Sequence, residues 1–247
     1  MSDLVGTTAI VTGAAMGIGA AYVRRLAAAG AQVALVDRAD CTDAMAGLAS
    51  ARAFSCDLAD PAAIADAAAA ILRWREGRLV LLNNAGAYPA TPLDTLTIEQ
   101  WRSVFAINLE SALLMSLGLI PAMKADGWGR IINVASSVVT IPRRHIAAYT
   151  ASKMAVIGLT RALATDLGPD GITVNAISPG LTRTPGTETQ LGEKGQSGLF
   201  DQFAASQPVR RVIEADDLTG MALFLAGDGS AMMTGQTLLV DGGLSRL

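Results

Sequence analysis

A glycine-rich turn between an apolar strand and a helix constrains the fold of this chain more than any other feature. An apolar run from Thr7 to Thr12 leads into the turn Gly13 to Gly19, GAAMGIG, and a helical apolar pattern then continues to Ala29. Glycines let the backbone turn tightly and approach a pyrophosphate, whose charge is stabilised at a helix N-terminus. The segment therefore predicts a strand, a dinucleotide-binding turn and a helix.

The next predicted strand, Gln32 to Val36, ends in an acidic residue that indicates the cofactor. Asp37 follows the turn at the distance where a carboxylate binds a ribose 2′-hydroxyl. Because a carboxylate there would repel a 2′-phosphate, we expect NAD rather than NADP. NADP is the less favoured alternative, because the guanidinium of Arg38 beside this site could bind a phosphate. Arg38 could also be a solvated loop residue with no role in binding.

Strand and helix patterns alternate along the rest of the chain. Further strands are expected at 52–56, 78–82, 131–135, 172–177 and 237–240, and helices at 61–74, 97–124, 149–167 and 216–226. Such alternation predicts a parallel, doubly wound sheet with right-handed crossovers. We therefore predict one α/β domain over residues 1–247, a Rossmann-type fold with a seven-stranded parallel sheet and helices on both faces. The glycine-rich segment at about 182–207 is expected to be a lid.

A tyrosine and a lysine at helical spacing form the candidate catalytic pair. Tyr149 and Lys153 share one face of the helix predicted from Tyr149 onward, and Ser136 follows the preceding strand. A nearby ammonium favours a phenolate, so we expect Lys153 to lower the pKa of Tyr149 toward neutrality. Ser136 can donate a hydrogen bond to a carbonyl oxygen at the same point. Together the three predict a site for carbonyl and alcohol chemistry, although a tyrosine and lysine alone are more often structural.

Charge and composition argue against several other classes of protein. The formal net charge of −3 provides no basic surface for nucleic acid. No run approaches the ~18 apolar residues of a membrane span, and the N-terminus lacks the basic region of a signal peptide. Cys41 and Cys56 are expected to be free thiols of a cytoplasmic protein. Because the chain has one histidine and no cluster of other ligands, we expect no metal site.

The individual motifs occur together in the order and spacing of a known family. They are TGAAMGIG, Asp37, Asp57, NNAG, Asn108, Ser136, YTASK, the Pro179-Gly180 turn and the closing VDGG, and they extend over essentially the whole chain. The sequence resembles the short-chain dehydrogenase/reductases. Single pieces of this pattern are weak evidence, whereas the combination is very specific.

The resemblance implies a catalytic tetrad. Tyr149 would be the general acid/base, and Ser136 would bind and polarise the substrate oxygen. Lys153 would lower the tyrosine pKa while bonding the nicotinamide ribose, and Asn108 would hold a water of the proton relay. Hydride would then pass between the substrate carbon and the nicotinamide, which is the chemistry of the cofactor itself.

The resemblance also implies a set of cofactor-binding residues. Met16 stands where NADP-preferring relatives often place a basic residue, which supports NAD. Thr182 departs from the aliphatic residue common at its position, whereas Thr184, the usual partner of the carboxamide, is kept. The expected cofactor-binding residues are Gly13, Met16, Gly17, Ile18, Gly19, Asp37, Arg38, Asp57, Leu58, Asn84, Ala85, Gly86, Tyr149, Lys153, Pro179, Gly180, Thr182 and Thr184.

The substrate is an expectation drawn from less specific features. Scaffold segments such as NNAGAYPATPLDTLTIEQW resemble NAD-dependent 1-phenylethanol dehydrogenases and, next, pyridoxal 4-dehydrogenases. We therefore expect an aryl or bulky alkyl secondary alcohol and its ketone, bound by Ser136, Val138, His145, Tyr149 and Leu181. A structural role for His145, in the loop that leads into the helix, is favoured over a role in substrate binding. The pair Arg143-Arg144 could meet an acidic group, but a solvated loop is favoured.

Three alternatives remain open. The same scaffold could act on pyridoxal, a 3-oxoacyl thioester or a sugar, or could catalyse a different reaction such as dehalogenation or epimerisation. A non-catalytic NAD-binding regulator is remote, because all four tetrad residues are present.

By resemblance, the protein should be a homotetramer that packs through the helices after Thr97 and around Tyr149, with a small alcohol or ketone as its ligand.

Overall fold

The computed structural model describes residues 3–196 and 198–245, except the side chains of 193–196. Within them, seven parallel strands form one sheet in the order β3-β2-β1-β4-β5-β6-β9. The strands are β1 (Thr7–Thr12), β2 (Gln32–Asp37), β3 (Ala51–Ser55), β4 (Arg78–Asn83), β5 (Gly129–Val134), β6 (Ile172–Pro179) and β9 (Thr237–Val240). This is the doubly wound, single-domain Rossmann-type fold that the sequence predicted.

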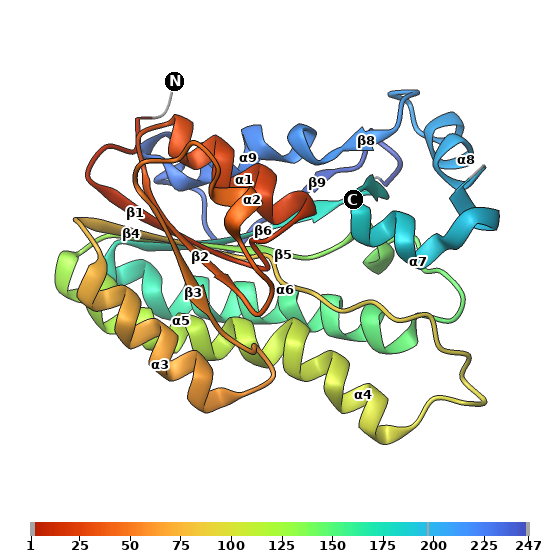
Figure 1. Cartoon of the computed structure of the whole chain (residues 1–247), viewed down its shortest axis with the longest axis horizontal. Coiled ribbons are helices and arrows are strands. Elements are labelled where there is room, and N and C mark those ends of the chain that lie inside the picture. Colours follow the sequence, from red (N-terminus) through yellow and green to blue (C-terminus); the bar gives the residue numbers. More distant parts are fainter. Residues whose placement is uncertain (1–2, 197, 246–247) are drawn as a thin grey trace.

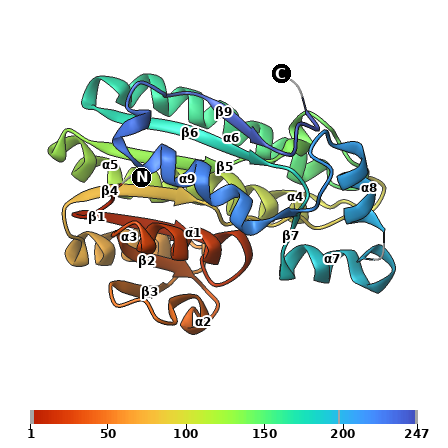
Figure 2. The same ribbon diagram turned by 90° about the horizontal axis from the view of Figure 1, so that it is seen from above.

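Helices cover both faces of the sheet (Figures 1 and 2). One face carries α1 (Gly17–Ala28), the short α2 (Thr42–Met45) and α9 (Thr219–Ala226), and the other carries α3 (Pro61–Trp74), α5 (Ser111–Asp126) and α6 (Ala147–Leu167). Because both faces are covered, β1 is buried along its whole length and β6 likewise.

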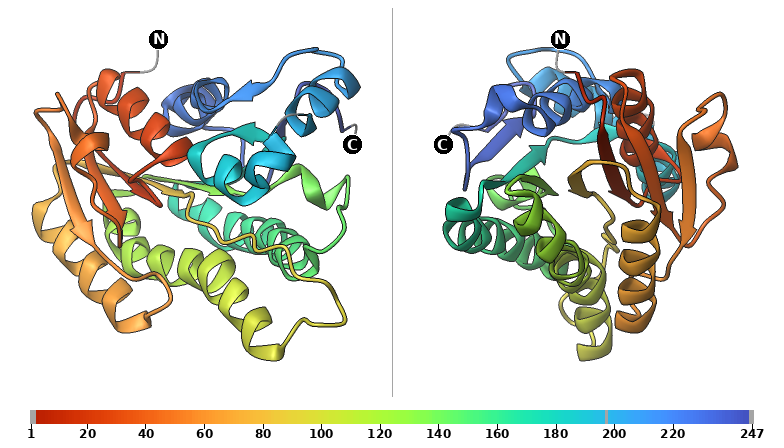
Figure 3. Two further views of the ribbon diagram at one scale, coloured as in Figure 1. Left: turned by 45° about the vertical axis from the view of Figure 1, so that its right-hand side comes forward. Right: turned by 90° about the vertical axis from the view of Figure 1, so that its left-hand side faces the viewer.

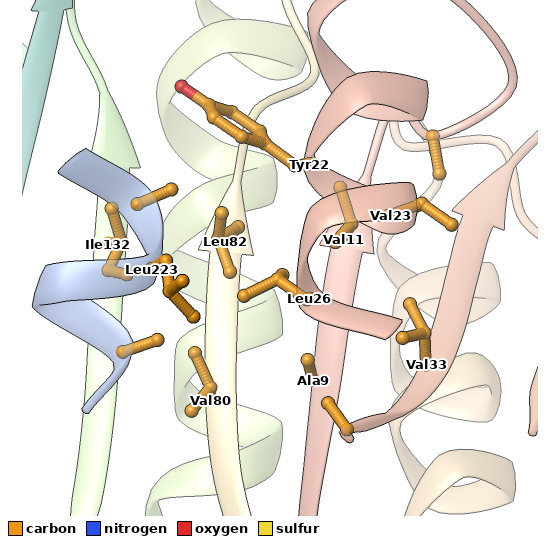
Figure 4. Close-up of a cluster of buried hydrophobic side chains, with 14 of the residues drawn as sticks. Ala9, Val11, Tyr22, Val23, Leu26, Val33, Val80, Leu82, Ile132 and Leu223 are labelled. Carbon is orange, nitrogen blue, oxygen red and sulfur yellow. The ribbon is translucent and has the colours of Figure 1, made fainter. Parts of the chain in front are cut away.

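Two apolar cores lie on the two sides of the sheet. In the first, Leu26 of α1 and Leu223 of α9 pack against Val80 and Leu82 of β4 (Figure 4). In the second, α3, α5 and α6 pack on the opposite face. Full burial of one such aliphatic side chain contributes about 1.5–3 kcal/mol. The cores therefore fix the strands whose carboxyl ends bear the site.

Local sequence features explain several element boundaries. Asp60 caps α3 by accepting a hydrogen bond from Ala62 N at 2.9 Å, and Pro61 occupies the first turn. Thr97 and Gln100 form the predicted capping box at the start of α4 (Ile98–Phe105). These caps begin helices where the sequence placed them.

Other boundaries differ from the prediction. The catalytic helix begins at Ala147 rather than Tyr149, and β5 covers Gly129–Val134 rather than 131–135. The last predicted helix is divided into a 3₁₀ turn, η4 (Ala215–Leu218), and α9. Segment 182–207 contains regular elements that the sequence did not reveal: β7 (Thr182–Arg183), α7 (Pro185–Gln196) and α8 (Leu199–Ser206). β7 pairs with β8 (Ile213–Glu214).

A long helical stretch, Ile98–Asp126, joins α4, a π-helical turn η1 (Ala106–Glu110) and α5. By length and composition alone it could cross a membrane. It instead packs along α3 and α6, with Met115 and Leu119 fully buried in the second core. This is the behaviour of a core helix.

Candidate active site

A cavity of about 630 Å³ opens at the carboxyl ends of the parallel strands, the edge where open α/β sheets bind ligands. Figure 3 shows α7 and α8 beside this edge. The cavity extends from the glycine turn after β1 to Tyr149 on α6 and to Phe203 on α8. One continuous space therefore joins the predicted cofactor residues to the predicted catalytic residues.

The glycine turn is built from backbone that leaves no room for side chains. Gly13 has φ +64, and a Cβ added to it would lie 2.8 Å from Ala85 Cα. A Cβ on Gly19 would lie 2.0 Å from Gly13 O. The backbone at Gly13 and Gly19 therefore packs closely at the N-terminus of α1, which suits a pyrophosphate.

The turn after β4 supports the glycine turn through hydrogen bonds. Asn84 Nδ2 donates to Thr12 O at 2.9 Å and to Gly13 O at 3.1 Å, while Thr12 Oγ1 accepts from the backbone N–H groups of Asn84 and Ala85. Asn84 and Ala85 of the NNAG motif therefore stabilise the neighbouring glycine turn.

Asp37 lies at the end of β2 with its carboxylate fixed by backbone. Oδ2 accepts a hydrogen bond from Ala15 N and Oδ1 accepts one from Ala39 N, both at 3.0 Å. Arg38 is exposed and also lines the cavity. The carboxylate is therefore held against the glycine turn, where the ribose of a dinucleotide would lie.

Every predicted cofactor residue lines this cavity. The glycine cradle, the fixed carboxylate and the strand-end turns fit a nicotinamide dinucleotide. The residues that would hold it are Gly13, Met16, Gly17, Ile18, Gly19, Asp37, Arg38, Asp57, Leu58, Asn84, Ala85, Gly86, Tyr149, Lys153, Pro179, Gly180, Thr182 and Thr184. Among the residues that the structure describes, no group of three or more His, Cys, Asp or Glu side chains could hold a metal ion.

Tyr149 and Ser136 both line the cavity, and their side chains interact there. Burial raises the pKa of Tyr149 to about 12, while the hydrogen bond to Ser136 and the charge of Arg143 lower it. Tyr88 packs against the same phenol, with ring centroids 5.8 Å apart. The phenol is therefore protonated at neutral pH in this structure.

Lys153 is buried beside this phenol, 3% exposed, and donates a hydrogen bond to Val134 O at 2.6 Å. Its Nζ lies 5.9 Å from the centre of the Tyr149 ring, and burial lowers its pKa to about 8. The predicted lowering of the Tyr149 pKa by Lys153 is wrong for this structure. Burial outweighs the other effects on Tyr149, and the groups that lower its pKa are Ser136 and Arg143.

Asn108 lies in the π-helical turn between α4 and α5, a type of distortion frequent at functional sites. Its Oδ1 accepts from Ala87 N at 2.7 Å, and its Nδ2 donates to Ala87 O and Ser152 Oγ, both at 2.9 Å. A Cβ on Gly86 would lie 3.5 Å from both Asn108 Oδ1 and Lys153 Nζ. Asn108 thus lies behind the cavity wall, next to Lys153, rather than in the wall itself.

The substrate side agrees only in part with the expected residues. Ser136, Val138, Tyr149 and Leu181 line the cavity, whereas His145 is exposed and lies outside the lining. His145 has a left-handed backbone, φ +65, and its carbonyl accepts a hydrogen bond from Thr91 N at 2.6 Å. Its observed contact is therefore made by its backbone, in the approach to α6.

Two residues of the substrate side were missed or assigned differently. Arg143 and Arg144 both line the cavity; Arg144 is exposed as expected, whereas Arg143 is half-buried rather than solvated. Its guanidinium carbon lies 5.4 Å from the centre of the Phe203 ring. Phe203 is far along the chain, on α8, so no local pattern in the sequence could have paired the two.

Comparison with known proteins identifies the family. A family model described as enoyl-(acyl carrier protein) reductase matches residues 13–245. D-beta-hydroxybutyrate dehydrogenase of Rhizobium meliloti is 36% identical, over 96% of this chain and 97% of its own length. D-threitol dehydrogenase of Mycolicibacterium smegmatis is 38% identical, over 97% and 93%. The chain belongs to the short-chain dehydrogenase/reductase family.

Solved structures of the family share the whole fold. A 3-oxoacyl (acyl-carrier-protein) reductase from Agrobacterium tumefaciens with NADP bound has a TM-score of 0.90 and 29% identity, covering 98% of this chain and 95% of that chain. The protein is thus an oxidoreductase of the short-chain dehydrogenase/reductase family, which binds a nicotinamide cofactor. The finer resemblance to 1-phenylethanol dehydrogenases is not confirmed, since these relatives are named for other substrates.

Proposed function

We propose that this protein is an NAD(H)-dependent dehydrogenase that interconverts a secondary alcohol and a ketone, with Tyr149 as general acid/base. The observation that carries the proposal is that Tyr149 and Ser136 line one cavity with the glycine turn, with Lys153 buried beside the phenol. A phenol and a hydroxyl that converge on one point can hold the oxygen of an alcohol or ketone.

The cofactor supplies the hydride acceptor or donor when it is bound. Ser136 donates a hydrogen bond to the substrate oxygen, and Tyr149 gives that oxygen a proton during ketone reduction or removes one during alcohol oxidation. Because the pKa of Tyr149 is raised to about 12, the protonated phenol is ready for reduction at neutral pH. Oxidation should therefore accelerate as the pH rises and the phenolate becomes populated.

Lys153 and Asn108 act behind this pair in our proposal. Lys153, held by Val134 O, places an ammonium near the phenol and the ribose of the cofactor. Asn108 Oδ1 and Lys153 Nζ approach Gly86 from the same side, which suits a water between them in a proton relay. Both roles concern placement and electrostatics rather than bond formation.

NAD is the proposed cofactor, with NADP less favoured. The support is the Asp37 carboxylate, held by Ala15 N and Ala39 N beside the glycine turn, because it would repel a 2′-phosphate. NADP remains the alternative, because Arg38 lines the cavity and a similar solved structure has NADP bound.

We further propose a cytoplasmic homotetramer, with the 182–207 segment as a lid over the cavity.

Our proposed substrate carries the reacting carbinol next to an apolar wall. Val138 and Leu181 line the cavity near Ser136, which supports the aryl or bulky alkyl group expected from the sequence. Hydroxy acids and polyols are further candidate substrates, because two similar proteins are named for hydroxybutyrate and threitol. Pyridoxal, 3-oxoacyl thioesters and sugars remain alternatives within the same chemistry.

Initial rates of the purified protein with NAD and NADP would test this proposal. The panel contains both enantiomers of 1-phenylethanol, 3-hydroxybutyrate, an aliphatic secondary alcohol, pyridoxal and a sugar. We expect NAD-linked oxidation of at least one secondary alcohol, faster at higher pH. Faster turnover with NADP would overturn the assignment of Asp37, and the absence of any turnover across the panel would contradict the proposed reaction.

A further inference from the structure

Arg143 places a cation in the wall of the active-site cavity. Among the residues that the structure describes, its guanidinium forms no ion pair and no hydrogen bond, and it is half-buried in the wall that also contains Tyr149 and Ser136. Burial lowers its pKa, while Tyr149 acts in the opposite direction. A half-buried guanidinium with unpaired donors carries a desolvation cost that an anionic ligand would remove.

The loop that bears Arg143 is anchored on both sides. Before it, Thr140 Oγ1 donates to Ser245 Oγ at 2.7 Å, and Ile141 N donates to Ser137 O at 2.9 Å. After it, His145 adopts its left-handed conformation and accepts the hydrogen bond from Thr91 N. A strained residue held in this way at an active site is consistent with a pre-organised loop.

The guanidinium also has a fixed neighbour on the lid. Its carbon lies 5.4 Å from the centre of the Phe203 ring of α8, so a cation–π contact steadies the planar group without using its N–H donors. Its charge reaches the Tyr149 phenol, whose pKa it lowers. Because Arg143, Tyr149 and Ser136 line one cavity, a bound substrate can contact all three.

We propose that Arg143 binds a carboxylate of the substrate, which makes the natural substrate a hydroxy acid or keto acid. The inference rests on the proposed function, because it needs the carbinol to lie between Ser136 and Tyr149. A guanidinium presents two parallel N–H donors that match the two oxygens of a carboxylate. The apolar wall at Val138 and Leu181 would then accept the uncharged end of the same molecule.

The test compares acids with their uncharged methyl esters. For wild type, kcat/KM would be measured with 3-hydroxybutyrate, 3-hydroxy-3-phenylpropanoate and the two methyl esters. We expect the acid of at least one pair to exceed its ester by about 10- to 100-fold, the range of a charge-assisted hydrogen bond. Arg143→Gln should abolish this preference through KM, and Arg143→Lys should restore part of it.

Matched measurements separate carboxylate binding from other roles of Arg143. Arg161→Gln removes the same charge from an exposed position of α6 and should leave the acid-to-ester ratio unchanged. If Arg143→Gln slows acid and ester equally, Arg143 only tunes Tyr149 and the proposal is overturned. Should the variant not fold, 3-phenylpropanoate must still inhibit wild-type oxidation of the esters more strongly than 3-phenylpropanamide does; equal inhibition also overturns the proposal.

The outcomes also distinguish this inference from the proposed function. If wild type oxidises esters and simple alcohols as well as it oxidises the acids, the proposed dehydrogenase activity is supported, but the proposed carboxylate site at Arg143 is wrong. If it oxidises neither acids nor neutral alcohols with either nicotinamide cofactor, the proposed function itself fails.

Discussion

The two halves of the cavity are built by different means. In the cofactor half, the turn Gly13 to Gly19 touches backbone, and additional Cβ atoms would lie 2.0–2.8 Å from neighbouring atoms at Gly13 and Gly19. In the substrate half, side chains from distant segments form the wall, as in the contacts of Arg143 with Phe203 and of Tyr88 with Tyr149. Close backbone packing therefore shapes the cofactor half, whereas side chains from distant segments shape the substrate half.

This difference predicts two classes of mutational effect. Changes in the cofactor half should alter stability and cofactor binding for every substrate alike. Changes at the rim of the substrate half should alter substrate affinity while leaving the cofactor bound.

The largest effect is expected for Gly19→Ala. Its Cβ would lie 2.0 Å from Gly13 O and 2.8 Å from Asn84 Nδ2, so the turn must open. We expect a loss of about 3 kcal/mol or more in the free energy of unfolding, together with at least ~100-fold weaker NAD binding. Chemical denaturation and calorimetric titration with NAD would measure the two effects.

Gly158→Ala is the matched control. Gly158 lies inside α6, and a Cβ there would meet no atom within 4 Å. Alanine in a helix interior is favoured over glycine, so this variant should gain about 0.5–1 kcal/mol and bind NAD as wild type does. Equal damage by both substitutions would contradict the account of the glycine cradle.

The second effect concerns Lys153 and pH. Burial lowers its pKa from 10.5 to about 8, so between these values the unfolded chain binds more protons than the folded chain and stability rises with pH. Relative to Lys153→Met, wild type should gain about 2–3 kcal/mol between about pH 7 and about pH 10. Denaturation of both proteins across this range would measure it; a constant difference would show that Lys153 is not buried as a cation.

A third prediction sharpens the cofactor half. Asp37→Asn keeps an oxygen that can accept from Ala39 N or Ala15 N but removes the negative charge. The ratio of kcat/KM for NAD to that for NADP should fall about 10- to 100-fold. Asp43→Asn, which removes an equal charge from exposed α2, should leave the ratio unchanged. Equal ratios in all three proteins would remove the argument for NAD.

The smallest effect is expected at Tyr88, which contacts the 182–207 segment. Tyr88 is hydrogen-bonded to Thr184, and its carbonyl accepts a hydrogen bond from Gln190 of α7. Tyr88→Phe keeps the ring beside Tyr149 and removes one neutral hydrogen bond. We expect KM for the alcohol to rise about 2- to 10-fold with NAD affinity unchanged. A change in NAD affinity alone would assign Tyr88 to the cofactor half.

The fold and the cofactor half were predictable because their determinants are local. The apolar run Thr7–Thr12, the glycine turn and Asp37 lie within one strand-turn-helix-strand unit, and the caps at Asp60 and Thr97 are short-range patterns. The structure brings all of the predicted cofactor residues to one cavity, although their roles with bound NAD stay predictions.

The substrate half was less predictable because its contacts are distant in sequence. Arg143 contacts Phe203, which lies inside the 182–207 segment, and the glycines at 186, 192 and 195 obscure the helix α7 in the sequence. The pKa of Tyr149 also depends on burial, which no spacing of Tyr149 and Lys153 reveals. His145 was expected at the substrate, but its left-handed backbone leaves its side chain exposed.

Tyr149→Phe, assayed with NAD binding measured on the same sample, tests the central claim most directly. The substitution removes the phenol oxygen that interacts with Ser136 and does not alter the glycine turn or Asp37. We predict unchanged NAD affinity and a fall in kcat of about 10²- to 10⁴-fold in both directions of the reaction, the range for a lost general acid/base. Turnover at the wild-type rate with NAD still bound would contradict the account.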